Sequence, residues 1–188
     1  MRLFTRSAII APTKAIIRAF TTPTPPAGST YPYTLKWTST ETPLTAVSFS
    51  KISDPASSPP TVDTRVIGWI NGPANTLPTP RNFTPNPRFE DFLHSVLKET
   101  VHTDVGWQAM AVNQKEGYMT VTDARVFTPW GRVADPEDLV GAVLLKNGKI
   151  VEGSYERMPA HRLVSTNGLF QLSETLHAKL IERLALLK

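Results

Sequence analysis

The stretch 140–152, VGAVLLKNGKIVE, indicates most directly how this chain folds. Two strand-like segments, Val140–Leu145 and Lys149–Glu152, flank the dipeptide Asn147-Gly148. Asn-Gly is a strong signal for a two-residue β-hairpin, because both residues accept the positive φ angles of a type I′ turn. In that register Leu145 faces Ile150 and Leu144 faces Val151. The stretch therefore predicts a tight antiparallel hairpin.

Two further hairpins are predicted on either side of this one. Residues Trp107–Val112 and Tyr118–Val126 read as strands around the turn-like residues 113–117. Residues His161–Ser165 and Leu169–Leu172 read as strands around Asn167-Gly168. We therefore expect an antiparallel or mixed sheet in the second half of the chain.

Two amphipathic helices are predicted to cover one face of that sheet. The first begins at Asn86, a good N-cap, with Pro87 at the first helical position, and ends near Val101. The second is capped by Ser173 and runs to about residue 187. Apolar side chains recur at helical spacing in both segments. They are Phe89, Phe92, Leu93, Val96 and Leu97 in the first, and Leu176, Leu180, Ile181, Leu184 and Leu187 in the second.

The first half of the chain is rich in proline, because 13 of the 17 prolines fall between Pro23 and Pro87. Proline disfavours helix interiors, so this half reads as strands joined by loops. The predicted strands are Tyr33–Trp37, Thr45–Ile52 and Thr64–Ile70, and the predicted loops are 54–61 and 72–86. Residues 21–30 are expected to form a flexible lead-in. The fold class predicted for residues 31–188 is a single α+β domain.

Residues 1–20, MRLFTRSAIIAPTKAIIRAF, have the composition of a mitochondrial transit peptide. They hold four basic residues and no acidic one, and from Thr13 a helix would gather Ile16, Ile17 and Phe20 on one side. We expect cleavage near Phe20/Thr21, within about two residues, and residence in the mitochondrial matrix. The alternatives are a secretory signal, which Pro12 and the charges interrupt, and an untargeted surface helix or tail.

The composition excludes several kinds of site. The sequence has no cysteine, which rules out disulfides, thiolate metal sites and cysteine nucleophiles. Its apolar runs are far shorter than the roughly 20 residues that span a bilayer. Four of the 20 basic residues lie in residues 1–20, so the other 16 balance the 16 acidic residues of the remaining chain. The balanced charge of residues 21–188 therefore does not predict nucleic-acid binding by this chain itself. Contact with a nucleic acid is expected only through a larger assembly.

No complete catalytic or cofactor motif is present. The sequence lacks the glycine-rich dinucleotide and phosphate-loop patterns, and its four histidines have no metal-ligand spacing. We therefore expect no cofactor and no metal. The weak catalytic candidates are Asp123, Arg125, His161 and Arg162, because acid, arginine and histidine in one cleft would suit a carboxylate- or phosphate-bearing ligand. The competing interpretation is that Asp123 and Arg125 simply pair with each other.

Two other segments contain candidate binding residues. Trp130, between Pro129 and Gly131, is a weak candidate for an exposed partner-binding anchor. The run Asp135-Pro136-Glu137-Asp138 offers three carboxylates for a divalent cation, but acids beside a proline more often open a helical turn.

From about Gly106 onward the chain resembles a family of small fungal proteins known only as uncharacterised. The segments that carry the resemblance are Gly117-Tyr118-Met119, residues 131–138, Gly141-Ala142-Val143, Gly148-Lys149-Ile150 and residues 155–162. It covers less than half of the chain. The resemblance favours a fungal source and implies no activity, cofactor or site.

The function expected from the sequence is that of a non-catalytic mitochondrial matrix protein, a subunit or assembly factor of a larger complex. The mitochondrial ribosome and the respiratory chain are not distinguished. This expectation depends on the missing catalytic motifs, the balanced charge and the long Pro-rich loops, which suit contact with a partner protein. It predicts an exposed apolar patch on the Pro-rich half. The alternative is a small-molecule-binding domain or enzyme acting on a carboxylate- or phosphate-bearing ligand.

Overall fold

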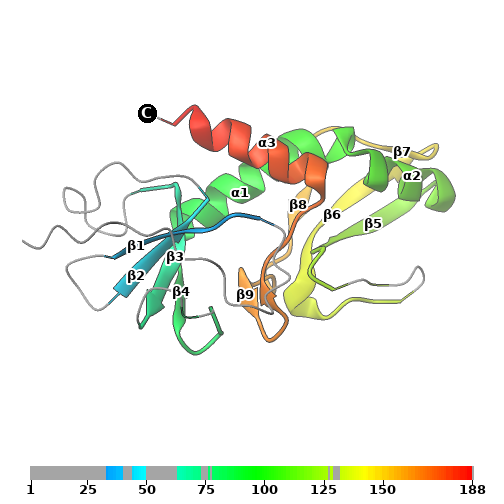
Figure 1. Cartoon of the computed structure of the whole chain (residues 1–188). Helices are drawn as coiled ribbons and strands as arrows, with labels where there is room; N and C mark the ends of the chain where they lie inside the picture. The colour runs from blue at the N-terminus through cyan, green and yellow to red at the C-terminus, as the bar shows by residue number, and fades with distance from the viewer. Residues whose placement is uncertain are drawn as a thin grey trace, which may run out of the picture.

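The computed structural model describes residues 33–39, 44–49, 63–72, 76, 78–126, 128 and 132–187. The expected transit peptide, the lead-in, the loop 54–61 and Trp130 lie outside these residues. Two four-stranded antiparallel sheets, a short two-stranded ladder and three α-helices make up the described part, which confirms the α+β fold class. Figure 1 shows both sheets on one side of helices α1 and α3.

The first sheet has the order β1-β2-β3-β4, and every pair in it is antiparallel. The strands are β1 (Lys36–Ser39), β2 (Leu44–Ser48), β3 (Val66–Asn71) and β4 (Phe83–Pro85). The first three confirm the predicted strands with shifted ends. The predicted loop 72–86 was wrong at residues 83–85, because Gly68 lets β4 approach β3 closely. A Cβ at Gly68 would lie only 2.3 Å from Cζ of Phe83.

The second sheet is built around the Asn147-Gly148 hairpin. Its strands are β5 (Gly117–Thr122), β6 (Leu139–Lys146), β7 (Lys149–Ile150) and β8 (Glu156–Arg157), with β6 pairing all three others. Leu145 faces Ile150 as predicted, and φ is +52° at Asn147 and +73° at Gly148. The third predicted hairpin is also present, as β9 (Val164–Ser165) and β10 (Gly168–Leu169).

Both predicted helices are confirmed, as α1 (Pro87–Thr100) and α3 (Glu174–Ala185). Asn86 is fully buried; its side chain accepts from the Arg88 N–H and donates to the carbonyl oxygens of Asp63 and Val66. The cap therefore also fixes α1 against the start of β3. Ser173 caps α3 by accepting from the Leu176 N–H.

The prediction of a strand at Trp107–Val112 was wrong, because these residues belong to helix α2 (Val105–Gln114). The carboxylate of Asp104 favours the helix over a strand, because its Oδ1 accepts the Trp107 N–H at 3.0 Å and caps the helix. The Ser173 hydroxyl donates to Oδ2 of the same Asp104, so the starts of α2 and α3 are joined. Two 3₁₀ turns, η1 (Val101–Thr103) and η2 (Pro136–Asp138), complete the helices, and η2 confirms the predicted helical turn.

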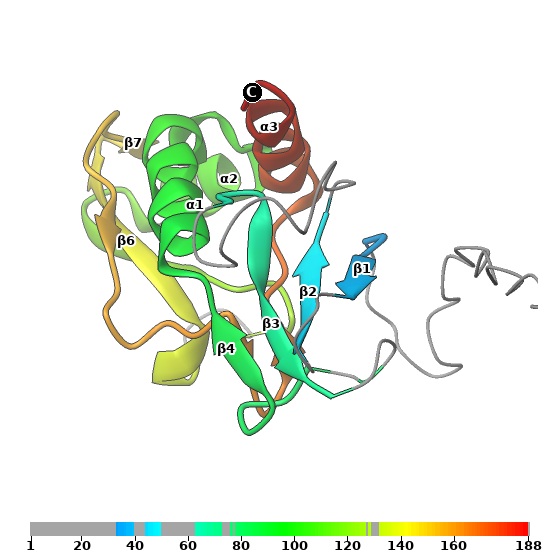
Figure 2. The same ribbon diagram turned by 90° about the vertical axis from the view of Figure 1, so that its left-hand side faces the viewer.

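One hydrophobic core joins both sheets and all three helices. It contains Val47 and Ile67 from the first sheet, Met119 and Val143 from the second, and the buried faces of the helices. Figure 2 shows α1 and α3 next to each other, and the buried leucines of both helices belong to this core. The described residues therefore form one domain with a continuous interior.

Candidate functional site

The most unusual feature of the interior is a buried arginine. Arg125 lies in the turn that follows β5, and its side chain has no exposed surface. Its Nη1 donates to Oγ of Ser165 at 2.9 Å and to the carbonyl oxygen of Gly168 at 2.7 Å. Its Nη2 donates to the carbonyl oxygen of Arg162 at 2.6 Å. The guanidinium thus holds the β9–β10 ladder against the end of β5.

Two buried carboxylates flank this guanidinium. Oδ2 of Asp123 lies 2.9 Å from Nη2, and Oδ1 of Asp138 lies 3.1 Å from Nε. The Nε–H does not point directly at its oxygen, so that contact is an ion pair rather than an aligned hydrogen bond. Oδ2 of Asp123 likewise has no aligned donor, but backbone and side-chain donors reach Oδ1 of Asp123 and both oxygens of Asp138. These donors are the N–H groups of Arg125 and Gln171 on Asp123, and the side chains of Ser165 and Asn167 on Asp138.

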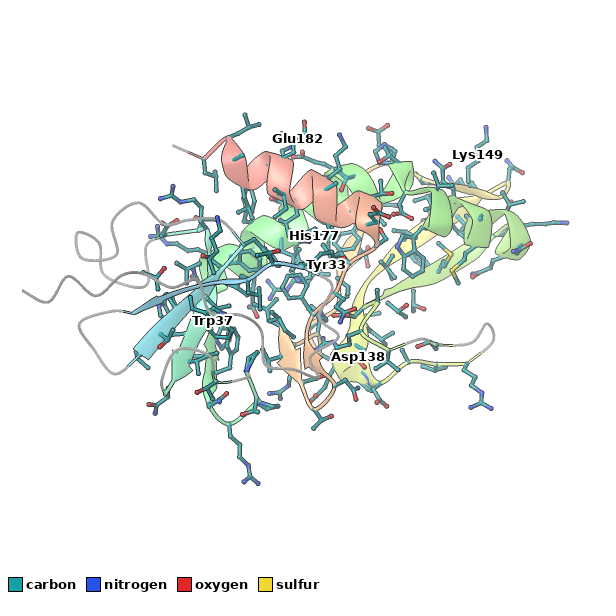
Figure 3. All side chains as sticks on the ribbon, viewed as in Figure 1. Tyr33, Trp37, Asp138, Lys149, His177 and Glu182 are labelled. Carbon is teal, nitrogen blue, oxygen red and sulfur yellow. The ribbon has the colours of Figure 1, made fainter. Side chains whose placement is uncertain are left out.

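These contacts form the Arg125 cluster, which we define as Asp123, Arg125, Asp138, His161, Ser165 and Asn167. Burying a charge is unfavourable unless its partners are well placed, and removing one partner leaves the others uncompensated. Figure 3 labels Asp138 at the lower edge of the second sheet, near the β9 strand. The cluster therefore connects β5, η2 and the β9–β10 hairpin.

His161 stands at the edge of the cluster. Its side chain is 3% exposed, and its Nε2 lies 3.5 Å from Oδ2 of Asp123. That distance is at the limit of a hydrogen bond, and Nε2 has no aligned partner among the described residues. The ring of His161 meets the ring of His94 edge-on, with centroids 5.9 Å apart. A histidine pair from α1 and the β8–β9 connection thus borders the cluster.

His94 and Tyr155 continue the polar contacts into the core. Nδ1 of His94 lies 2.8 Å from the Tyr155 hydroxyl, and that hydroxyl donates to the carbonyl oxygen of Val140 at 3.1 Å. Because the hydroxyl has one proton, His94 must donate its Nδ1–H to it. Burial, with the nearby charge of Arg157 and His161, lowers the pKa of His94 to about 3. Burial also raises the pKa of Tyr155, so both groups are neutral at physiological pH.

Three of the four weak catalytic candidates come together in the structure. Asp123, Arg125 and His161 share the Arg125 cluster, and Asp123 and Arg125 pair with each other across a turn. Arg162 does not join them: its side chain is 64% exposed and pairs with Glu137 at 3.1 Å. Only its backbone carbonyl reaches the cluster.

Sequence reasoning missed Asp138, His94 and Tyr155. The sequence offered Asp138 only as a cation ligand or as part of a helical turn, and His94 only as one of four histidines without metal-ligand spacing. The one available signal was the position of His94, which falls beside the apolar stripe of α1. Nothing local to the sequence points from His94 to Tyr155, because 61 residues separate them.

Other kinds of site find little support in the part of the chain that the structure describes. No group of three or more His, Asp or Glu side chains there is arranged to hold a metal ion. A shallow hollow between α1 and α3 is lined by Phe92, Val96, Leu186 and Leu187 among others, and none of its lining residues belongs to the Arg125 cluster. No helix among these residues has the length and apolarity needed to cross a membrane.

Comparisons with known proteins give no relative: no protein-family model, no curated protein and no solved structure matches the chain. The resemblance to a fungal family stays a prediction.

Proposed function

We propose that the chain is a non-catalytic mitochondrial matrix protein that serves as a subunit or assembly factor of a larger complex. The observation that carries this proposal is the burial of the Arg125 cluster. The guanidinium donates to three oxygens of the fold itself and lies beside two buried carboxylates. The residue types that best suit a small anionic ligand are therefore engaged in holding strands together.

The surface gives a second line of support. Large apolar side chains are exposed at Val105, Val112, Tyr118, Val126, Val133 and Leu186. Scattered exposed apolar residues are ordinary, but Val105 and Val112 lie on one helix, seven positions apart, with the exposed Ala109 between them. Such a stripe suits contact with a partner protein. The apolar patch expected on the Pro-rich half stays a prediction, since much of that half lies outside the described residues.

The test is the size of the native particle. The full-length chain with a C-terminal tag is expressed in fungal cells, and a mitochondrial lysate is separated by size exclusion. We expect the tagged protein to elute well above the mass of the 20.7 kDa chain. If all of the tagged protein elutes at about that mass, the proposed membership of a complex is wrong. If the tagged protein is absent from mitochondria, the proposed location is wrong.

A second candidate function is supported by one observation. Nε2 of His161 is buried without an aligned partner and lies 3.5 Å from Asp123. An acid–histidine pair of this kind is a common arrangement for proton transfer, so the alternative is an enzyme or binding domain for a carboxylate- or phosphate-bearing ligand. Thermal unfolding in the presence of simple carboxylates and phosphates tests it, because a ligand that binds only the folded state raises the melting temperature. A rise that disappears in Arg125→Lys would favour this alternative.

A further inference from the structure

One end of the molecule gathers lysines. At this end the α2 helix stops, β5 begins, and the β6–β7 hairpin turns, which is the right-hand end of the molecule in Figure 1. The Gly148 N–H donates to the carbonyl oxygen of Lys115 at 2.8 Å, and the Asn147 N–H donates to Oε1 of Glu116 at 2.8 Å. These bonds join the two turns into one surface, which we call the basic tip and define as residues 112–118 and 146–149. Figure 3 labels Lys149 on its outside.

The lysines of the basic tip are exposed and lack opposite charges. Lys115, Lys146 and Lys149 are all exposed, and none forms an ion pair with another described residue. Glu116 is the one acid within the tip. Past the hairpin the next acidic residue is Glu152, whose carboxylate lies 4.0 Å from the His102 ring, and at the start of α2 it is Asp104, which is buried.

Several basic residues elsewhere on the surface have carboxylate partners, whereas four others are unpaired among the described residues but lie singly on separate segments: Lys36, Arg81, Lys98 and Arg132. Arg157 pairs with two carboxylates of α1, and Arg183 pairs with Glu99. Lys179 pairs with Glu182 within α3. The basic tip differs because it gathers three unpaired lysines around one acidic residue, Glu116, and therefore has an excess of positive charge.

Two features of the tip reduce the stability of the fold. Lys146 and Lys149 are directly opposite each other across the hairpin, where like charges repel. Lys115 has φ +69° and ψ −55°, and the Glu116 N–H donates to the Gln114 carbonyl oxygen at 2.9 Å. This is a γ-turn with a positive φ at its centre, a rare and strained conformation that glycine adopts without penalty. Strained residues of this kind are concentrated at functional sites.

Apolar side chains stand beside the lysines. Val112 is 61% exposed in the last turn of α2, and a Cβ at Gly148 would lie 3.4 Å from its Cα. Tyr118 is 64% exposed at the start of β5, where the Gln114 side chain donates to its carbonyl oxygen. An aliphatic and an aromatic side chain next to unpaired lysines is the composition of surfaces that enter the interface of a lipid bilayer.

We infer that the basic tip docks on an anionic phospholipid membrane. The excess of positive charge is complementary to lipid phosphates, and Val112 and Tyr118 gain by leaving water at the headgroup level. RNA is the other polyanion, but the tip has no arginine, and an exposed valine contributes little to contact with a phosphate backbone. Each lysine near an anionic surface is expected to raise affinity about fivefold. The attachment is therefore weak and reversible.

The test compares full-length variants by co-sedimentation with vesicles of phosphatidylcholine, with and without phosphatidylglycerol. Because residues 1–20 are themselves basic and amphipathic, every protein carries the same substitutions Arg2→Gln, Arg6→Gln, Lys14→Gln and Arg18→Gln. The test variant replaces the three lysines of the tip by Gln, and the matched control replaces three basic residues outside it. The control substitutions are Lys36→Gln, Arg81→Gln and Lys98→Gln.

We expect binding only to vesicles that contain phosphatidylglycerol, weakened about 100-fold in the test variant and little in the control. Added salt is expected to weaken it further. Equal affinity of the two variants, or equal binding to neutral vesicles, would overturn the inference. So would tighter binding to a single-stranded RNA than to the anionic vesicles.

Lys115→Gly separates binding from folding. Glycine relieves the γ-turn, so the melting temperature is expected to rise by about 2–4 °C while vesicle affinity falls about fivefold. Lys115→Arg keeps the charge and is expected to keep the affinity. If Lys115→Gly binds anionic vesicles as tightly as the unsubstituted lysine, Lys115 has no part in the docking and the inference fails.

Discussion

Arg125 and the three lysines of the basic tip are all cations in the second half of the chain, but their surroundings are opposite. Arg125 has no exposed side-chain surface and lies between two buried carboxylates. Lys115, Lys146 and Lys149 are exposed and have no carboxylate partner among the described residues. The buried carboxylates need the enclosed cation as their partner, whereas the exposed lysines, two of which repel each other, are free to contact another molecule.

The largest expected effect comes from removing the enclosed cation. In Arg125→Met two buried carboxylates lose their cation, and three oxygens of the β9–β10 region lose a donor. We expect the free energy of unfolding to fall by about 3–5 kcal/mol, measured by urea denaturation. A loss below about 1 kcal/mol would mean that the Arg125 cluster does not hold the strands together.

A matched substitution at the surface provides the control for that experiment. Arg162→Met removes an arginine whose side chain is 64% exposed and pairs with Glu137. Exposed pairs contribute little, so the expected change is within about 1 kcal/mol. The difference between the two variants measures how much burial of the cation matters.

The next effect concerns the neutral histidine beside the cluster. The pKa of His94 is about 3 in the folded chain and has an ordinary value of 6.5 when exposed. The unfolded state therefore takes up the proton first, so stability is complete above the ordinary pKa and is lost as pH falls toward the folded one. Between about pH 7 and pH 5.5 the loss is about 1 kcal/mol. His94→Gln is expected to reduce the pH dependence by that amount, as urea denaturation at both pH values would show; an unchanged pH dependence would mean that His94 is charged in the fold.

The smallest effect is a gain. Lys146→Glu places opposite charges across the β6–β7 hairpin in place of two lysines. We expect stability to rise by about 0.2–1 kcal/mol at low salt, and the rise to shrink as salt is added. Thermal unfolding at two salt concentrations measures it. A destabilised variant would contradict this, because it would show that Lys146 stabilises the fold and that repulsion from Lys149 does not lower its stability.

The sequence predicted the fold where the signal is local. Asn147-Gly148 fixed a hairpin and its register, and Asn86 and Ser173 marked two helices whose apolar stripes are buried. It failed where local preferences conflict. Residues 105–112 contain Trp107 and two valines, which favour strands, and carry no clear apolar stripe, yet the carboxylate of Asp104 starts a helix there. The three-residue strand β4 was missed because it depends on its partner β3.

The candidate site was predicted only in part for the same reason. Asp123 and Arg125 are neighbours in sequence, and their pairing was one of the two interpretations considered. Asp138 and Ser165 reach the same guanidinium from distant segments, which no local pattern reveals. Whether the Arg125 guanidinium is open to a ligand or buried depends on tertiary packing, which a local sequence pattern does not reveal.

The most direct test of this account is urea denaturation of two full-length variants side by side. One is Arg125→Met, and the other carries Lys115→Gln, Lys146→Gln and Lys149→Gln together. The account predicts a loss of about 3–5 kcal/mol in the first and no loss, or a small gain, in the second. A triple variant destabilised as much as Arg125→Met would contradict it, because the lysines would then belong to the structural framework.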